Sequence, residues 1–417
     1  VRTADGNVRP LGTPSDWRFV DLVIDERLNR VLALGERHTP GAHEPTNAIV
    51  AIDLGSGQVD VLRAGRDFYA CPRLSPDGRS LLYLAWDHPH MPWDAAELHV
   101  CALDDAGRPR APEGAAVAGD ARASVFAPGF LADGSIVFAW EPRGFWNLHR
   151  WKDGHIRVLH EDAAEYGQPL WQPGTTTWAE ARVDGVPMIA CAWTRNGGFG
   201  FGLMPIDGGA PRPLSLPFST ISQVAAQGDT ALLLAGAPDL PMSVVAVDLA
   251  RGTHRIVRRS TELVLDPRYL SRPEAVTFPT TDGDVAHGFY YPPTNPAFEP
   301  LPGERPPLLV TAHGGPTSAN TVSMLPSFQY WTSRGFGLLD VNYRGSTGYG
   351  RAYRDRLRDH WGIYDVDDCV AGARFLADAG RVDAKRLAIR GGSAGGYTVL
   401  AALAFRDAFA AGASHYG

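Results

Sequence analysis

The stretch "RLAIRGGSAGGYTVL", residues 386–400, decides how the second half of this chain folds. Apolar residues at Leu387 and Ile389 predict a buried strand, the glycines predict a sharp turn, and the segment from Ala394 onward predicts a helix. A serine placed in such a turn projects its hydroxyl away from the backbone, where it can attack a carbonyl carbon. Ser393 is therefore a candidate nucleophile between a strand and a helix.

The residues next to Ser393 suit that role. Gly391, Gly392 and Gly395 permit the sharp turn and close packing of the helix, so we expect them to form a nucleophile elbow. The N–H group of Ala394, at the start of the helix, points to where negative charge develops during attack. A second donor belongs after an earlier strand, and "HGGP" (residues 313–316) ends the apolar run "PPLLVTA".

Length and composition set limits on the class of protein. The chain has 417 residues, which is too many for one ordinary core, so two domains are expected. A net charge of -7 without any Lys/Arg cluster excludes a basic surface for nucleic acid or an anionic membrane, and no apolar run is long enough for a membrane span. Cys71, Cys101, Cys191 and Cys369 show no metal-like spacing, and we expect buried thiols in a reducing, cytoplasmic compartment.

Residues 1–258 consist of short strand-like runs that repeat. "LSPDGRSLLYLAW" with "AELHVCALDDAG" is echoed by "FLADGSIVFAW" with "FWNLHRWKDG", and three weaker copies can be found. Five such units predict the blades of an all-β propeller domain. The opening "VRTADGNVRPL" is similar to the tail of a blade, so a larger ring with further blades before it is favoured over a propeller of five blades.

Residues 259–417 change from this pattern to an α/β pattern. After the Pro-interrupted connector "RRSTELVLDPRYLSRPEAVTFPTTDG", strand-like runs alternate with helical ones. "DVDDCVAGARFLADAG" places one apolar face at helical spacing, namely Val366, Cys369, Val370, Ala373, Leu376 and Ala377. This alternation predicts a doubly wound, mostly parallel sheet.

Three motifs in this order, "HGGPTS", "DVNYRGSTGYG" and "IRGGSAGGY", behind a propeller, resemble the prolyl oligopeptidase family of serine peptidases. The acylaminoacyl peptidase and dipeptidyl aminopeptidase branch is the most similar. The resemblance implies an α/β-hydrolase domain with a Ser/Asp/His triad that hydrolyses short peptides, while the propeller excludes folded proteins. It implies no cofactor and no metal.

The resemblance also assigns residues. Ser393 falls on the nucleophile of the family and Ala394 on one oxyanion donor. Some relatives use a tyrosine hydroxyl as the second donor, and His313 occupies that position here. The backbone N–H of Gly315 is then the favoured donor, and the imidazole of His313 is the alternative.

A base for Ser393 is hard to find in the chain. In α/β-hydrolases the acid and the histidine follow the nucleophile, but only Asp407 and His415 do so here, within 24 residues. His313 belongs to the oxyanion loop, and His360 is favoured as a structural histidine. We therefore expect the triad Asp and His beyond Gly417, in a hydrolase domain that is incomplete at its C-terminus.

Several alternatives remain open at this level. A carboxylesterase would use the same site, and a catalytically inactive propeller protein would use the chain as a binding platform. "DHPHMPWD" (residues 87–94) could hold a metal, although an ordered loop is favoured. Oligomeric state, including a homo-oligomer, is not determined by the sequence.

Overall fold

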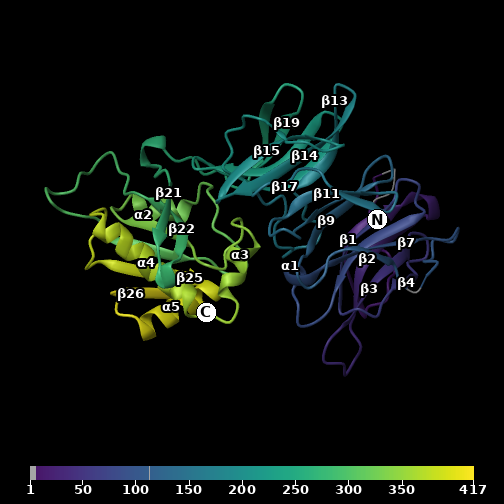
Figure 1. Cartoon of the computed structure of the whole chain (residues 1–417), viewed down its shortest axis with the longest axis horizontal. Coiled ribbons are helices and arrows are strands. Elements are labelled where there is room, and N and C mark those ends of the chain that lie inside the picture. The colour runs from purple at the N-terminus through teal and green to yellow at the C-terminus, as the bar shows by residue number, and fades with distance from the viewer. Residues whose placement is uncertain (1–5, 112) are drawn as a thin grey trace. The chain divides into compact units, whose positions relative to one another are not determined.

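The computed structural model describes residues 6–111 and 113–417. The chain divides into two compact units. The first contains the chain up to Asp162 together with residues 166–180 and 204–211, and the second contains residues 163–165, 181–203 and 212–417. Figure 1 shows that the N-terminal part consists mainly of strands, whereas strands and helices alternate toward the C-terminus.

Five four-stranded sheets follow one another along the chain, and each has its strands in chain order. Neighbouring strands of the first, second, third and fifth sheets pair antiparallel. The strands are β1 (Trp17–Asp25), β2 (Arg30–Arg37), β3 (Thr46–Asp53), β4 (Val59–Arg63), β5 (Phe68–Leu74), β6 (Ser80–Trp86), β7 (Glu97–Ala102), β8 (Ala115–Ala118), β9 (Val125–Phe130), β10 (Ile136–Trp140), β11 (Asn147–Lys152), β12 (His155–Val158), β13 (Trp178–Val183), β14 (Val186–Arg195), β15 (Gly198–Pro205), β16 (Arg212–Pro213), β17 (Thr220–Gln227), β18 (Thr230–Ala237), β19 (Leu240–Asp248) and β20 (Thr253–Arg259). The five predicted repeats are confirmed as five sheets.

Equivalent turns close the hairpins of the two clearest repeats. Between β5 and β6, the Ser75 hydroxyl donates to Asp77 at 2.6 Å, and Gly78 takes a φ of 67°. Between β9 and β10, the Asp133 carboxylate accepts the Ser135 N–H at 3.0 Å, and Gly134 takes a φ of 81°. A positive φ costs glycine little, so each Asp-Gly pair fixes the place where the chain reverses.

The sheets of the first unit pack through both faces of their inner strands. On β6, Leu82 lies in one cluster with Phe138 of β10, while Leu81 lies in another with Ile49 of β3. All four side chains are fully buried. Because successive residues of a strand face opposite sides, β6 contributes to the core on each side of its sheet.

A sixth sheet has six strands in the order β21-β22-β24-β23-β25-β26. The strands are β21 (Glu274–Pro279), β22 (Val285–Tyr291), β23 (Leu308–Ala312), β24 (Gly337–Asn342), β25 (Leu387–Gly392) and β26 (Ala411–His415). The four strands from β24 to β26 are parallel, and β21 and β22 add antiparallel. The helices near it are α2 (Pro326–Thr332), α3 (Arg351–Arg354), α4 (Tyr364–Asp378) and α5 (Ala394–Phe405), and α1 (Pro92–Ala95) lies between β6 and β7.

Two elements differ from the sequence-based expectation. The segment read as a connector contains β21, because "EAVTFP" pairs with β22 over its whole length. Helix α2 was not expected, since a run of only seven residues is too short to show a clear helical period. The fifth sheet ends at Arg259, and the domain boundary between residues 258 and 259 stays a prediction.

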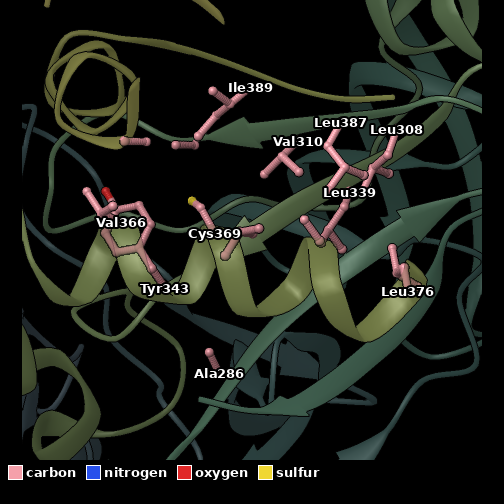
Figure 2. Close-up of a cluster of buried hydrophobic side chains, with 14 of the residues drawn as sticks. Ala286, Leu308, Val310, Leu339, Tyr343, Val366, Cys369, Leu376, Leu387 and Ile389 are labelled. Carbon is pink, nitrogen blue, oxygen red and sulfur yellow. The ribbon is translucent and has the colours of Figure 1, made fainter. Parts of the chain in front are cut away.

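Helix α4 packs against the parallel strands, as Figure 2 shows for Val366, Cys369 and Leu376. Strand residues Val310 and Leu339 meet them from the sheet, and all five side chains are fully buried. The predicted apolar face of this helix is confirmed, because all six of its residues are buried. Such burial stabilises the fold by roughly 1.5–3 kcal/mol per large aliphatic side chain.

All four cysteines are free and buried, as the sequence predicts. Burial raises the pKa of the Cys71 thiol to about 12 and that of the Cys369 thiol well above its usual value. A thiol with a raised pKa is a poor nucleophile. Within the described part of the chain, no helix has the length and apolar character needed to cross a membrane.

Candidate active site

Ser393 lies between the end of β25 and the start of α5, as predicted. Its backbone has φ 55° and ψ -124°, a conformation that residues other than glycine rarely adopt. Two backbone hydrogen bonds hold it: the Ser393 N–H donates to the His415 carbonyl at 3.0 Å, and its own carbonyl accepts the Tyr397 N–H at 3.1 Å. Strained residues of this kind concentrate at functional sites.

Two of the predicted elbow glycines have a steric reason to be there. A Cβ atom on Gly395 would overlap the Ala312 carbonyl oxygen, and one on Gly391 would overlap the Gly395 carbonyl oxygen. These atoms are backbone and cannot move aside, so only glycine lets α5 start this close to β23 and β25. At Gly392 the neighbour is the Tyr416 hydroxyl, 3.0 Å from the position of a Cβ.

The loop after β23 approaches the same turn. A Cβ atom on Gly314 would lie 3.4 Å from the Ser393 Cβ and 4.0 Å from its Oγ. Neither the Gly315 nor the Ala394 N–H donates to a protein acceptor within residues 6–111 and 113–417. The structure thus brings the loop that contains Gly315 next to the turn that contains Ser393 and Ala394.

His313 has both ring nitrogens bonded to groups other than Ser393. Its Nδ1 lies 2.8 Å from the Gly314 carbonyl oxygen, and its Nε2 lies 2.8 Å from the Ser346 hydroxyl. Burial lowers the pKa of His313 to about 4, so the ring is neutral at physiological pH. This arrangement favours the Gly315 amide over the imidazole as the second donor.

The other candidate partners of Ser393 lie elsewhere. His415 faces Gly392 across the β25-β26 pair with an exposed side chain, and Asp407 is exposed after α5. His360 bonds to the Arg358 carbonyl and stacks on Tyr364. In the part of the chain that the structure describes, no hydrogen bond joins the Ser393 hydroxyl to an imidazole.

The residues of the "DHPHMPWD" loop, for which a metal site was the less favoured interpretation, make contacts with other parts of the protein. The Asp87 carboxylate pairs with Arg66 at 2.5 Å, and Asp94 accepts the Met91 N–H at 3.1 Å at the start of α1. His88 packs edge-on against Phe68. These residues take part in the hairpin between β6 and β7, which agrees with the ordered loop favoured from the sequence.

The sequence did not single out two residues that bond directly to His313. Tyr343 and Ser346 both belong to "DVNYRGSTGYG" and are fully buried. The motif was quoted for its resemblance alone, without a role for any residue in it. The spacing within the chain cannot show that this loop and "HGGP" meet, because 30 residues separate Tyr343 from His313.

Residues 322–417 match the model of the prolyl oligopeptidase family. Among curated proteins, an uncharacterized peptidase, YuxL, of Bacillus subtilis is 28% identical over 162 residues, which is 38% of this chain and 24% of that protein. Dipeptidyl aminopeptidase BIII of Pseudoxanthomonas mexicana is 35% identical over 112 residues, 27% of this chain and 16% of that protein. The predicted resemblance to this family is confirmed.

Solved structures extend the similarity over nearly the whole chain. A puromycin-hydrolyzing peptidase of Mycobacterium tuberculosis superposes with a TM-score of 0.89 at 38% identity, over 96% of this chain and 62% of that one. A structure of puromycin hydrolase gives a TM-score of 0.90 at 35% identity, over 98% and 63%. The chain therefore spans less than two thirds of the length of these relatives.

Proposed function

We propose that this chain supplies the propeller and the nucleophile-bearing part of the α/β-hydrolase domain of a serine peptidase that cleaves short peptides. The observation that carries the proposal is the strained turn at Ser393 beside the loop after β23, in which the amides of Ala394 and Gly315 donate to no protein acceptor among the described residues. In this assignment the five four-stranded sheets are propeller blades, and the six-stranded sheet belongs to the hydrolase domain. The similarity to puromycin-hydrolysing peptidases at 35–38% identity supports it.

The chemistry follows from these groups. The Ser393 Oγ attacks the carbonyl carbon of the substrate, and a base accepts the hydroxyl proton as the new C–O bond forms. The negative oxygen of the tetrahedral intermediate receives hydrogen bonds from the two amides. The C–N bond then breaks, the proton passes to the leaving amine, and water hydrolyses the acyl-enzyme. We assign the base and its carboxylate partner to a segment outside the 417 residues.

The test uses the full-length protein that contains this chain. A fluorophosphonate probe followed by mass spectrometry reports whether Ser393 forms an adduct. Puromycin, aminoacyl p-nitroanilides and acylaminoacyl p-nitroanilides report peptidase activity, and p-nitrophenyl esters report esterase activity. A Ser393 adduct together with amide hydrolysis supports the proposal. An adduct with ester hydrolysis alone indicates a carboxylesterase, and the absence of both indicates a binding protein.

A further inference from the structure

Asn196 is the only asparagine of the sequence that a glycine follows, in "TRNGG" at residues 194–198. The pair forms the turn between β14 and β15, where Asn196 takes a φ of 49° and Gly197 a φ of 76°. Asparagine tolerates this left-handed conformation better than most residues, and glycine adopts it freely, so the pair closes a tight hairpin. The turn therefore has a structural reason to be Asn-Gly, and the same pair allows a chemical reaction.

The side chain of an asparagine lies within reach of the next backbone nitrogen. After losing its proton, that nitrogen can attack the side-chain carbonyl carbon and close a succinimide ring. The C–N bond to the side-chain nitrogen breaks as the ring forms, and ammonia leaves with the proton. Water then opens the ring at either carbonyl carbon and gives aspartate or isoaspartate. The reaction needs water alone, and it is one reason why asparagine is a thermolabile residue.

Three features of the turn favour this reaction at Asn196. Gly197 has no side chain that would hinder the approach of its nitrogen to the Asn196 side-chain carbonyl carbon. Among residues 6–111 and 113–417, the Gly197 N–H donates to no acceptor, so no protein hydrogen bond has to break before the proton leaves. Asn196 is exposed, which gives water access to its side chain.

The turn packs against the loop that follows β24. A Cβ atom on Gly197 would lie 2.7 Å from the Tyr349 hydroxyl, and one on Gly348 would lie 3.1 Å from the Thr194 methyl group. The Tyr349 hydroxyl in turn accepts a hydrogen bond from the Asn342 side chain at 3.1 Å. The backbone of the turn therefore has little room to change without displacing Tyr349.

Asn196 also lines a cavity of about 190 Å³ together with Thr277, His287 and Tyr349. The His287 ring lies flat on the Tyr349 ring, with centroids 4.4 Å apart and an interplanar angle of 4°. The His287 Nδ1 atom lies 3.0 Å from the Thr277 hydroxyl. None of the described residues that line the cavity is a lysine or an arginine. A carboxylate in place of the Asn196 amide would thus put a negative charge on a wall without a permanent positive partner.

We propose that Asn196 is a site of spontaneous deamidation, and that the isoaspartate form of the turn displaces Tyr349 and the loop that follows β24. Isoaspartate adds a carbon atom to the main chain at a turn that has little spare room. The displaced loop contains Thr347, whose N–H donates at 2.8 Å to the Ser318 carbonyl in the loop after β23. The modification goes beyond the proposed function, and only its effect on catalysis rests on that function.

Storage of the full-length protein at pH 8 tests the modification. Peptide mapping by mass spectrometry measures the conversion of Asn196 to aspartate and isoaspartate, and an isoaspartyl methyltransferase labels the second product. Asn29 is the matched internal control, because its φ of 48° is nearly that of Asn196 while Arg30 follows it in place of a glycine. We expect Asn196 to convert and Asn29 to stay intact. No conversion of Asn196, or equal conversion of both residues, would overturn the inference.

Two variants separate the added charge from the added carbon atom. Asn196→Asp carries the charge without the longer main chain, and Asn196→Gln keeps a neutral amide that cyclises far more slowly. We expect kcat of the isoaspartate form to be about 10-fold lower, as for a small misplacement of a catalytic group. Freshly prepared Asn196→Asp should lose less, and Asn196→Gln should keep its initial kcat during storage.

Repair of the stored protein provides the closing measurement. The methyltransferase converts isoaspartate to aspartate, so repair should return kcat to the value of Asn196→Asp. Conversion of Asn196 without loss of kcat would overturn the displacement of Tyr349. Absence of amide hydrolysis and of Ser393 labelling in the fresh wild-type protein would overturn the proposed function instead, and the mass measurement would still decide whether Asn196 is modified.

Discussion

The turn at Ser393 and the loop after β23 each supply one amide to the candidate oxyanion site, but they are ordered in different ways. The Ala394 amide is set by local structure, because the turn joins β25 directly to α5 and its glycines admit one path. The loop that contains Gly315 is held by side chains from the 342–347 region, far away in the sequence. One candidate donor thus lies in a turn that is encoded locally, and the other lies in a loop that is held by tertiary contacts.

The loop after β23 is held by several hydrogen bonds to residues that are distant in the sequence. The Asn320 N–H donates to the Asn342 Oδ1 at 2.7 Å, and the Asn320 side chain donates to the Val341 carbonyl at 2.9 Å. The Thr347 N–H donates to the Ser318 carbonyl at 2.8 Å. The comparison teaches that substitutions far from Ser393 should alter one amide and leave the other in place.

The largest fall in kcat should come from substitution of Ser393, the candidate nucleophile that lies next to both amides' segments. Ser393→Ala removes the attacking oxygen, and we expect kcat to fall on the order of 10⁶-fold with little change in the free energy of unfolding. Amide hydrolysis and fluorophosphonate labelling of the full-length protein measure this. Ser215→Ala, at an exposed serine, is the control and should keep both signals. Residual labelling in Ser393→Ala would show that another residue reacts.

Gly395→Ala tests whether the turn at Ser393 depends on its local glycines. The added methyl would overlap backbone oxygen, so we expect a loss of about 1–3 kcal/mol in the free energy of unfolding and a fall in kcat. Urea unfolding and steady-state kinetics measure the two effects. Gly12→Ala is the matched control, because nothing lies within 4 Å of the Cβ position there. Equal stability of both variants would mean that the elbow does not need glycine at 395.

Asn342→Ala tests whether the loop after β23 depends on its tertiary contacts. Asn342 is fully buried and bonds the Asn320 N–H, so its loss should cost about 1–3 kcal/mol. Because the loop then loosens, kcat should fall about 10-fold, within the range seen for a small misplacement of a catalytic group. Asn295→Ala is the control, since Asn295 also bonds backbone groups in a loop, at Ser333 and Ala297. It should lower stability without lowering kcat.

The smallest effect on kcat should come from substitution of Asp340. This residue of β24 pairs with Thr311 of β23, the strand that leads into the loop. Asp340 is 3% exposed, and burial raises its pKa to about 7, although Thr311 and Arg390 oppose the shift. The unfolded carboxyl has a pKa of about 3.9, so between pH 4 and 7 the folded state binds more protons. The free energy of unfolding should therefore fall as pH rises through that window, by up to about 1.4 kcal/mol per unit.

Asp340→Asn removes the titrating proton and should flatten that slope while leaving kcat unchanged. Urea unfolding at pH 5, 6, 7 and 8 measures it, with Asp184→Asn at an exposed turn as the control. The Asn variant should be the more stable protein at pH 8, and the difference from wild type should shrink as the pH falls toward 4, where both carboxyl states of the wild type bind the proton. A slope that survives the substitution would show that another group titrates in this range.

The sequence predicted the features that arise from neighbouring residues. The Asp-Gly turns and alternating apolar residues predicted the five repeats, and the helical spacing of one apolar face predicted α4. Because the glycines around Ser393 restrict the backbone locally, the strand-turn-helix order of the candidate site was also predictable. The assignment of roles to Ser393, Ala394 and Gly315 stays a proposal.

The tertiary structure alone decided which side chains hold the loop after β23. His313, Tyr343 and Ser346 meet because β23 and β24 pair in parallel, which places the loops after both strands at one edge of the sheet. The same pairing places Asp340 beside Thr311 in the interior and raises the pKa of its carboxyl. A pattern along the chain records which residues are apolar and where the backbone turns. It does not record which distant side chains become neighbours, and those neighbours hold the loop after β23 and raise the pKa of Asp340.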